Sequence, residues 1–291
     1  MNLNALTLRA YFAAREVGRA GMGRRAPWLA HGVKRLANLV LPQTPAWVQV
    51  RSGISQGLWM RLHLPDEARL WRGEQEVGVQ KAILASVGPG SVVFDIGAHA
   101  GSIALGVARL VSPTGRVVAF EADPANVESL TENILRNRLS ASVQVVHAAV
   151  WSCGAANIPF RQSGIRRSHG GVETDSQRPV LASGELISVP AITLDDFIVA
   201  AGLVPQLVKI DVEGGEHEVL RGGTRLFTKQ RPLVIAEIHH GQAAEQIRAW
   251  LTELEYSAHW IIPSESFPCC LFAWPREFDG PHWMQRSEVG S

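Results

Sequence analysis

The sequence lacks any apolar stretch long enough to cross a membrane as a helix, which needs about 18–20 residues. It contains only three cysteines, Cys153, Cys269 and Cys270, too few for the disulfide framework of a small secreted domain. Neither sign of charge dominates, because 28 Lys and Arg residues stand against 27 Asp and Glu residues. These absences predict a cytoplasmic protein with no transmembrane segment. They also argue against a dedicated nucleic-acid binder, whose basic surface would dominate the charge count.

Charged residues are scarce, at 19% of the chain, whereas hydrophobic residues make up 46%. Intrinsic disorder requires the opposite balance, with low hydrophobicity and high net charge. A folded chain of this length buries roughly three quarters of the surface that it exposes when unfolded. The composition therefore predicts a large hydrophobic core.

Composition divides the chain into three expected parts. Residues 1–46 carry seven basic side chains against the single acid Glu16. We expect a helical or partly mobile arm there, suited to weak contact with a membrane surface or an acidic partner. Residues 47–88 predict two short strands and a helix packed on the core. Residues 89–291 predict the main domain, with an insertion at 151–190 that shows no clear periodicity.

From residue 92 onward, short apolar runs alternate with amphipathic segments of helical length. This alternation predicts an α/β fold, with a mostly parallel central sheet and helices on both faces. The last two apolar runs have no helix between them and predict a C-terminal antiparallel hairpin. The expected strands are 92–94, 117–120, 143–146, 207–210, 233–236, 258–262 and 269–274, and the expected helices are 101–112, 124–138, 215–229 and 241–255.

Two strand ends carry the pattern of a site for an adenosine cofactor. Asp95 ends one strand. The small residues Gly97, Ala98 and Gly101 follow at the start of a helix, where unpaired backbone N–H groups can donate hydrogen bonds to a ligand. A carboxylate at this position would repel a dinucleotide pyrophosphate, but it suits the cationic groups of S-adenosylmethionine. Glu121 ends the next strand and is placed to accept hydrogen bonds from ribose hydroxyls. The pair favours S-adenosylmethionine over a nicotinamide cofactor.

Two later strand ends carry candidate catalytic groups. Asp211 and Glu213 stand two residues apart after one strand, so both point to the same side as the strand finishes. Glu237 and His239 repeat this spacing at the end of the next strand. Such groups can act as a general base or bind a divalent cation, although Glu213 and Glu216 also suit a helix N-terminus. We predict a site without metal, because no further acidic cluster accompanies the Asp-x-Glu pair.

Taken in order, these motifs resemble the FkbM-type S-adenosylmethionine-dependent methyltransferases. Asp-Ile-Gly-Ala-His-Ala-Gly at 95–101 is similar to the family's cofactor loop, and Phe-Glu-Ala-Asp-Pro at 120–124 to its ribose-binding strand end. Lys-Ile-Asp-Val-Glu-Gly-Gly-Glu at 209–216 continues the pattern. The chain departs from it at His99, where the family usually has Asn, and at Gly215, where it usually has Ala.

The resemblance implies a Rossmann-like class I methyltransferase fold and O-methylation of a hydroxyl on a sugar or a secondary metabolite. The acceptor would then be a small molecule or a glycan. Two other functions stay open at this point: a nicotinamide-dependent oxidoreductase and a non-catalytic cofactor-binding module. The residues implied are Asp95, Gly97, Ala98, Gly101, Glu121 and the backbone near Ala149 for the cofactor, and Asp211, Glu213 and His239 for catalysis.

Overall fold

The computed structural model describes residues 45–64, 67–162, 171–172, 184–263 and 267–280. Nearly all of the basic arm predicted at 1–46 therefore lies outside the described residues, as does much of the insertion. The chain divides into two compact units, Met1–Gln75 and Glu76–Ser291. Within the described ranges, no helix has both the length and the apolar character that a membrane span requires.

The first unit contains a small antiparallel hairpin. Strand β1 (Ala46–Gln49) pairs with β2 (Trp59–Leu62), and alternate side chains of each strand are buried. Helix α4 (Ala68–Arg72) follows. The guanidinium of Arg51 lies 5.3 Å from the centre of the Trp71 ring, a cation–π contact that joins the hairpin turn to the helix. The hairpin confirms the two short strands predicted in this part of the chain.

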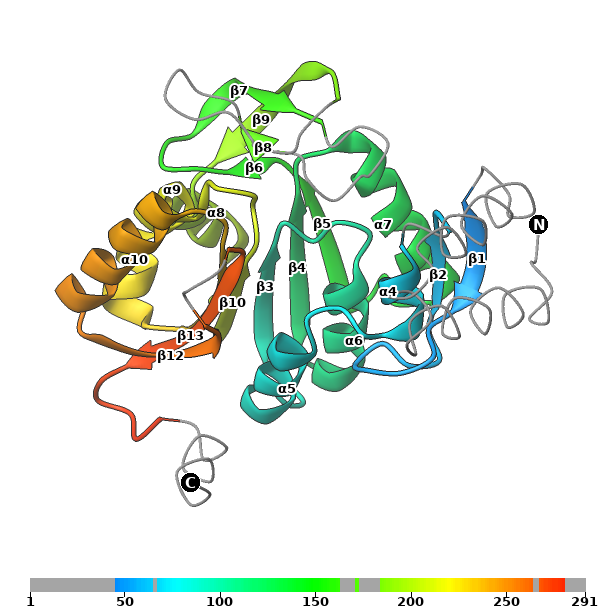
Figure 1. Ribbon diagram of the computed structural model, residues 1–291, viewed down its shortest axis with the longest axis horizontal. Helices are drawn as coiled ribbons and strands as arrows, with labels where there is room; N and C mark the ends of the chain where they lie inside the picture. The colour runs from blue at the N-terminus through cyan, green and yellow to red at the C-terminus, as the bar shows by residue number, and fades with distance from the viewer. Residues whose placement is uncertain (1–44, 65–66, 163–170, 173–183, 264–266, 281–291) are drawn as a thin grey trace, which may run out of the picture. The chain divides into compact units, whose positions relative to one another are not determined.

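The second unit is built on a seven-stranded sheet with the order β12-β13-β11-β10-β3-β4-β5 (Figure 1). The five strands from β11 to β5 are parallel, and β13 runs antiparallel to both β11 and β12. This arrangement confirms the predicted parallel sheet and the C-terminal hairpin. The strands are β3 (Val92–Ile96), β4 (Arg116–Glu121), β5 (Val143–His147), β10 (Leu207–Ile210), β11 (Leu233–Ile238), β12 (Tyr256–Ile262) and β13 (Cys269–Pro275).

Helices cover both faces of this sheet. Helices α6 and α7 lie on one side, and α8, α9 and α10 lie on the other (Figure 1). Asp123 caps α7 by accepting the N–H of Ala125 at 3.0 Å, the preferred role of aspartate at this position. The helices are α5 (Val77–Ser86), α6 (Ser102–Val111), α7 (Pro124–Arg136), α8 (Leu194–Ala201), α9 (Glu216–Gly222) and α10 (Gly241–Glu253), with a π-helix, η3, at Leu226–Gln230.

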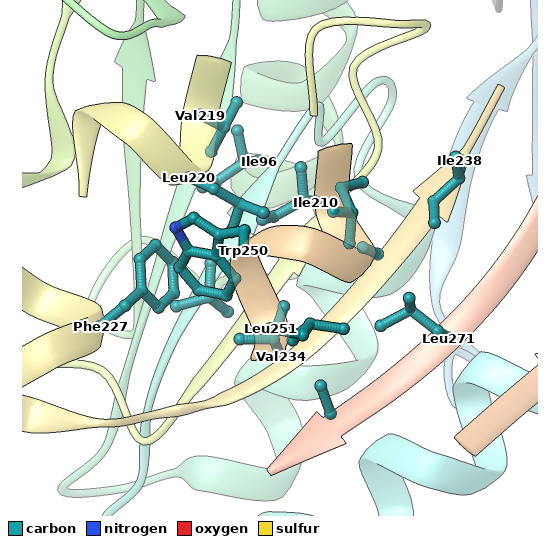
Figure 2. Packing of buried hydrophobic residues seen from close by; sticks show 14 of the residues in the cluster. Ile96, Ile210, Val219, Leu220, Phe227, Val234, Ile238, Trp250, Leu251 and Leu271 are labelled. Atoms are coloured by element: carbon teal, nitrogen blue, oxygen red, sulfur yellow. The ribbon is translucent and has the colours of Figure 1, made fainter. Parts of the chain in front are cut away.

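The main hydrophobic core lies between the sheet and helices α8, α9 and α10. Figure 2 shows Trp250 of α10 against Phe227, with ring centroids 4.9 Å apart in an edge-on arrangement. All four residues of β10 are buried, as a central parallel strand requires. This core packs against the strands whose carboxyl ends carry the ionisable side chains described below.

The insertion differs from expectation, because it contains regular strands where the sequence showed no periodicity. Strands β6 (Ala149–Val150), β9 (Leu186–Ile192), β7 (Ala155–Arg161) and β8 (Gly171–Val172) form a second sheet in that order. This second sheet has a small hydrophobic core of its own, and Phe160 is one of the buried residues in it. Pairing between β7 and β9 is antiparallel and joins residues about 30 apart in the chain. Local sequence carries little signal for such long-range contacts.

The single helix predicted over 215–229 is wrong in its extent. Helix α9 ends at Gly222, and the π-helix begins at Leu226. A Cβ atom added at Gly222 would lie 2.0 Å from the backbone oxygen of Trp151, so another segment of the chain approaches here too closely for a side chain. Helix α8 was not expected at all.

Candidate active site

Four neighbouring parallel strands end in ionisable side chains at one edge of the main sheet. Asp95 of β3 stands beside Lys209 of β10 in the strand register, and Glu121 is the last residue of β4. Glu237 belongs to the end of β11, and His239 follows that strand directly. Ligands of open α/β sheets bind beyond the carboxyl ends of the strands. This edge is therefore the candidate site.

The loop after β3 has a backbone that excludes side chains at two positions. A Cβ atom added at Gly97 would lie 1.8 Å from the backbone oxygen of Asp211. One added at Gly101, which precedes α6, would lie 2.5 Å from Cδ1 of Leu130. His99 adopts a left-handed conformation with φ of 51°, a region that Asn and His enter more readily than most residues. His99 can therefore adopt the same loop backbone as the asparagine that the family usually has at this position.

Glu121 ties this loop to the end of β4. Its Oε2 accepts the backbone N–H of His99 at 2.7 Å, and its Oε1 accepts that of Asp123 at 2.9 Å. Burial raises the pKa of the Glu121 carboxyl, although both hydrogen bonds oppose this shift. Nδ2 of Asn126 also donates to Oε1 at 3.4 Å, so among the described residues Oε2 is the oxygen that keeps a second lone pair. The predicted contact to ribose hydroxyls is thus compatible with the bonds already made, and it stays a prediction.

The remaining cofactor candidates lie beside the same strand end. The N–H of Ala98 donates to the backbone oxygen of Phe120 at 3.0 Å, and that of Ala148 donates to the oxygen of Glu121 at 3.1 Å. Ala149 is buried in β6 and stands opposite Ala191 of β9. Residue 149 is therefore adjacent to the predicted ribose position, which is the geometry that the adenine prediction needs.

Lys209 is buried among carboxylates and was not predicted as a site residue. Its Nζ lies 3.2 Å from Oδ2 of Asp211. The same atom lies 3.5 Å from Oε2 of Glu76 and 3.7 Å from Oδ1 of Asp95. Burial alone would lower the pKa of Lys209, but these carboxylates raise it well above its usual value. The lysine is a buried positive charge between Asp95, a predicted cofactor residue, and Asp211, a predicted catalytic residue.

His239 forms the second centre of the cluster. Its Nδ1 lies 2.7 Å from Oε1 of Glu216, a buried carboxylate. Its Nε2 faces three other carboxylates, with distances of 3.4 Å to Glu213, 3.7 Å to Asp211 and 3.8 Å to Glu237. The predicted catalytic residues therefore meet in space, and Glu237 joins them.

The charges in this cluster set different protonation states for its members. Burial lowers the pKa of His239, but the hydrogen bond and charge of Glu216 and the nearby carboxylates raise it to about 10. Burial raises the pKa of Glu213 to about 7 and that of Glu237 to about 8. Burial also acts on Asp211, but Lys209 and His239 outweigh it and lower the pKa of that carboxyl. At neutral pH the imidazole is a cation and Asp211 is an anion.

This arrangement favours a carboxylate as the proton acceptor. A general base works best when its pKa lies near the operating pH, which describes Glu213. Asp211 is ionised but is a weaker base, and His239 already carries its proton. Of the predicted catalytic residues, Glu213 is therefore the best matched to accept a proton.

Two overlapping groups among the described residues are close enough to hold a metal ion, with ligand atoms within 4.8 Å of one another. Each already lies against a positive side chain, because His239 belongs to one and Lys209 touches the other. These cations balance part of the negative charge that would attract a metal. The groups are Asp211, Glu213 and His239, and Glu76, Asp211 and Glu237.

Sequence reasoning missed three members of the cluster: Lys209, Glu76 and Glu216. The sequence did give a signal for Lys209, because a lysine inside a four-residue apolar strand needs a charged partner. Glu76 gave no such signal, since it lies far from the strand ends in the sequence. Glu216 was interpreted as a residue that favours the start of a helix, and its burial could not be seen in the sequence.

The mostly parallel sheet with its antiparallel C-terminal hairpin is that of a Rossmann-like class I methyltransferase. Residues 95–258 match the methyltransferase FkbM domain, which is more than half of the chain. The protein belongs to this family. Membership removes the alternative of a nicotinamide-dependent oxidoreductase.

Two characterised relatives align with the chain. It is 28% identical to the hexuronic acid methyltransferase AglP of Haloferax volcanii over 233 residues, which cover 72% of this chain and 87% of AglP. It is 30% identical to the 31-O-demethyl-FK506 methyltransferase FkbM of Streptomyces tacrolimicus over 174 residues, which cover 52% of this chain and 66% of that protein.

Solved structures show more distant likeness. The methyltransferase FkbM of Methylobacillus flagellatus is 16% identical with a TM-score of 0.47, covering 63% of this chain and 43% of that one. The chain thus spans less than half of that structure. M. jannaschii TYW2, solved in complex with AdoMet, is 15% identical with a TM-score of 0.46. The match covers 80% of this chain and 85% of the TYW2 chain.

Proposed function

We propose that this protein is an S-adenosylmethionine-dependent O-methyltransferase that acts on a hydroxyl group of a sugar or a secondary metabolite. The observation that carries the proposal is the convergence of two carboxylate pairs at one edge of the sheet. Asp95 and Glu121 form the cofactor pair, and Asp211 and Glu213 form the catalytic pair. Lys209 contacts a member of each pair, at 3.7 Å from Asp95 and 3.2 Å from Asp211.

The residues on the cofactor side fit S-adenosylmethionine. Asp95 is 1% exposed, and neither of its oxygens has a hydrogen-bond partner among the described residues. A buried carboxylate without such a partner calls for an additional donor, and the ammonium group of a bound cofactor would supply one. Glu121 and the backbone near Ala149 would hold the ribose and the adenine.

The catalytic side has the groups that transfer to a hydroxyl requires. S-adenosylmethionine supplies, when bound, a methyl group on a positively charged sulfur. The acceptor hydroxyl must lie in line with that methyl group and lose its proton as the new bond forms. Glu213 accepts this proton on its carboxylate. Lys209 keeps Asp211 ionised, so Asp211 can accept a hydrogen bond from a second hydroxyl of the acceptor and orient the molecule.

The names of two relatives support an oxygen acceptor. One is named for a hexuronic acid, which offers hydroxyl and carboxyl oxygens, and the other for the 31-O-demethyl form of FK506. We extend an oxygen acceptor to this chain and propose that it is a hydroxyl.

We further propose a cytoplasmic location, a small-molecule or glycan acceptor, and no role in nucleic-acid binding. The near-neutral charge supports the last point. Cys153, Cys269 and Cys270 are all free thiols, which suits a reducing compartment. The basic arm remains a candidate for weak contact with a membrane surface or an acidic partner.

A transfer assay tests the proposal directly. The protein is incubated with S-adenosylmethionine carrying a labelled methyl group and with two probes, a hexuronic acid and a neutral hexose glycoside. We expect labelled methyl ether in at least one reaction, identified by mass. EDTA should leave its formation unchanged, whereas loss of turnover that Mg²⁺ restores would contradict the metal-free site. Labelled methyl ester in place of ether would contradict O-methylation of a hydroxyl.

A binding experiment tests the cofactor site separately. Calorimetry should detect binding of S-adenosylhomocysteine and no binding of NADH. Glu121→Ala should weaken this binding by about 1.5–3 kcal/mol, the usual scale for hydrogen bonds to a charged group. Glu128→Ala removes an exposed carboxylate from α7 and is the matched control. Equal affinity in the two variants would show that the ribose is not held by Glu121.

A further inference from the structure

Glu216 is buried beside the proposed base, although it begins a helix. It is the first residue of α9, and its side chain is 0% exposed. Its Oε1 accepts the N–H of Gly214 at 2.9 Å and lies 2.7 Å from Nδ1 of His239. One carboxylate oxygen therefore joins the turn after β10 to the end of β11.

The contact at Nδ1 decides what the other ring nitrogen of His239 faces. With Nδ1 held by Glu216, Nε2 lies 3.4 Å from Oε2 of Glu213 and 3.7 Å from Oδ1 of Asp211. The hydrogen bond made by one ring nitrogen of a histidine sets the orientation and the role of the other. A free imidazole could rotate about its side-chain bonds and turn Nε2 away from these carboxylates.

The contact at Gly214 fixes the other side of the same site. Glu213 has a left-handed backbone with φ of 55°, and Gly214 follows with φ of 113°. Such a turn is unfavourable for a glutamate unless its surroundings hold it. The bond from Gly214 to Glu216 closes the turn, so the carboxylate that holds His239 also holds the backbone that presents Glu213.

A role limited to favouring the helix N-terminus does not account for this burial. An acidic residue in the first turn acts on the helix dipole from the surface, where water solvates its charge. Glu218 is such a residue, since it is partly exposed and pairs with Arg221 at 3.3 Å. Glu216 is removed from water, and its Oε2 has no hydrogen-bond partner within the described part of the chain. Burying a carboxylate in this way costs free energy.

We propose that Glu216 is a positioning residue for methyl transfer: by holding Nδ1 of His239 and the N–H of Gly214, it sets the imidazole against Glu213 and Asp211. The role rests on the proposed function, because it concerns the geometry of the proposed base. It adds a residue that acts through His239 and does not touch the acceptor.

Nuclear magnetic resonance tests the contact without requiring turnover. Full-length protein labelled with ¹⁵N-histidine is saturated with S-adenosylhomocysteine, and His239→Gln assigns the signals of His239. We expect a ring N–H proton shifted far downfield by its bond to a carboxylate. Glu216→Ala should abolish this signal, and Glu216→Gln should keep a weaker shift because its amide oxygen still accepts. Glu218→Ala, the matched control on the same helix, should leave the signal unchanged.

Kinetics then tests whether the position matters for transfer. With the probe that accepts methyl groups in the transfer assay, Glu216→Ala should lower kcat about 10–100-fold, the scale of a small misplacement of reacting groups. The KM for the acceptor and the affinity for S-adenosylhomocysteine should stay within about threefold, and Glu216→Gln should recover most of kcat. Glu216→Asp, which keeps the charge on a shorter side chain, replaces the alanine variant if that variant does not fold.

The outcomes separate this inference from the proposed function. If wild-type protein transfers no methyl group but the downfield proton depends on Glu216, the function fails and the contact stands. If wild-type protein is active and Glu216→Ala matches Glu218→Ala in kcat, the positioning role is overturned. A downfield proton that persists in Glu216→Ala overturns it as well.

Discussion

At the scale of single residues, the site is governed by an excess of buried negative charge. Lys209 and His239 are the cations at its two centres, and each contacts several carboxylates. Burial is the main reason that the pKa values of Glu213 and Glu237 rise to about 7 and 8, and the neighbouring carboxylates add to this rise. A cationic cofactor would relieve this repulsion, whereas an anionic one would add to it. The carboxylates are Glu76, Asp95, Asp211, Glu213, Glu216 and Glu237.

The raised pKa of Glu213 predicts a pH-dependent rate. A base must be deprotonated to act, so kcat should rise with pH through about 7 and then level off. Glu213→Gln should lower kcat about 10²–10⁴-fold and remove this rise, the usual range for a general base. Asp211→Asn should also lower kcat but keep the rise, because the pKa of Asp211 lies below its usual value. The measurement is a pH profile of kcat for each variant.

The control for this series is Glu253→Gln, an exposed carboxylate at the end of α10, which should behave as wild type. A flat profile in Asp211→Asn with a normal rise in Glu213→Gln would assign the base to Asp211. Wild-type kcat in both variants would show that the strand-end carboxylates are structural.

At the scale of elements, the loop between β3 and α6 is held by close backbone approach. Gly97 has φ of 80°, and the oxygen of Asp211 occupies the space that its Cβ atom would need. The loop that we propose for the cofactor and the loop after β10, which carries the proposed catalytic pair, are therefore in direct contact. The same principle explains Gly215, because a Cβ atom there would lie 2.5 Å from Cζ3 of Trp151. Gly215 stands where the family usually has alanine, and the missing Cβ atom leaves room for the Trp151 ring.

This close approach predicts an unequal cost for two glycine substitutions. Gly202 also has a positive φ, of 65°, but nothing lies within 4 Å of its Cβ position. Gly202→Ala should lower the free energy of unfolding by about 1–2 kcal/mol, the cost of the left-handed backbone alone. Gly97→Ala adds a clash with backbone and should cost more than about 4 kcal/mol. Urea unfolding of both variants measures the difference, and equal midpoints would contradict the close contact.

At the scale of the whole molecule, the two sheets of the second unit carry different parts of the proposed site. The seven-stranded sheet presents the charged cluster, and the four-stranded sheet begins at Ala149, beside the end of β4 (Figure 1). The insertion is thus attached where the adenine contact is predicted. A ligand that binds near Ala149 would stabilise both sheets together.

This attachment predicts a local response to the cofactor. S-adenosylhomocysteine should slow hydrogen exchange in peptides that cover β6 (Ala149–Val150) and its neighbour β9 (Leu186–Ile192). Peptides from the hairpin of β12 and β13, at the opposite end of the main sheet from β5, serve as the internal control and should not change. Exchange measured by mass spectrometry with and without the ligand tests this. Unchanged exchange at β6 under saturating ligand would place the adenine elsewhere.

The parallel sheet, the C-terminal hairpin and the family could all be predicted from the sequence. These features depend on local patterns: apolar runs of strand length, amphipathic segments between them, and motifs of a few residues at strand ends. Asp95, Glu121, Asp211 and His239 could be selected as candidates because parallel strands bring their carboxyl ends to one edge. No contact between distant segments is needed for that inference.

Which ionisable groups meet, and in which protonation state, depends on the folded chain. Lys209 and Glu76 are far apart in the chain, and their ion pair exists only because α5 and β10 belong to one folded unit. The strands of the insertion arise from pairing between distant residues, which leaves no local period. Glu216 is an acid at a helix start in the sequence, but in the folded chain it is buried and contacts His239 through a hydrogen bond. Burial and long-range pairing depend on the whole chain, so no short segment of sequence specifies them.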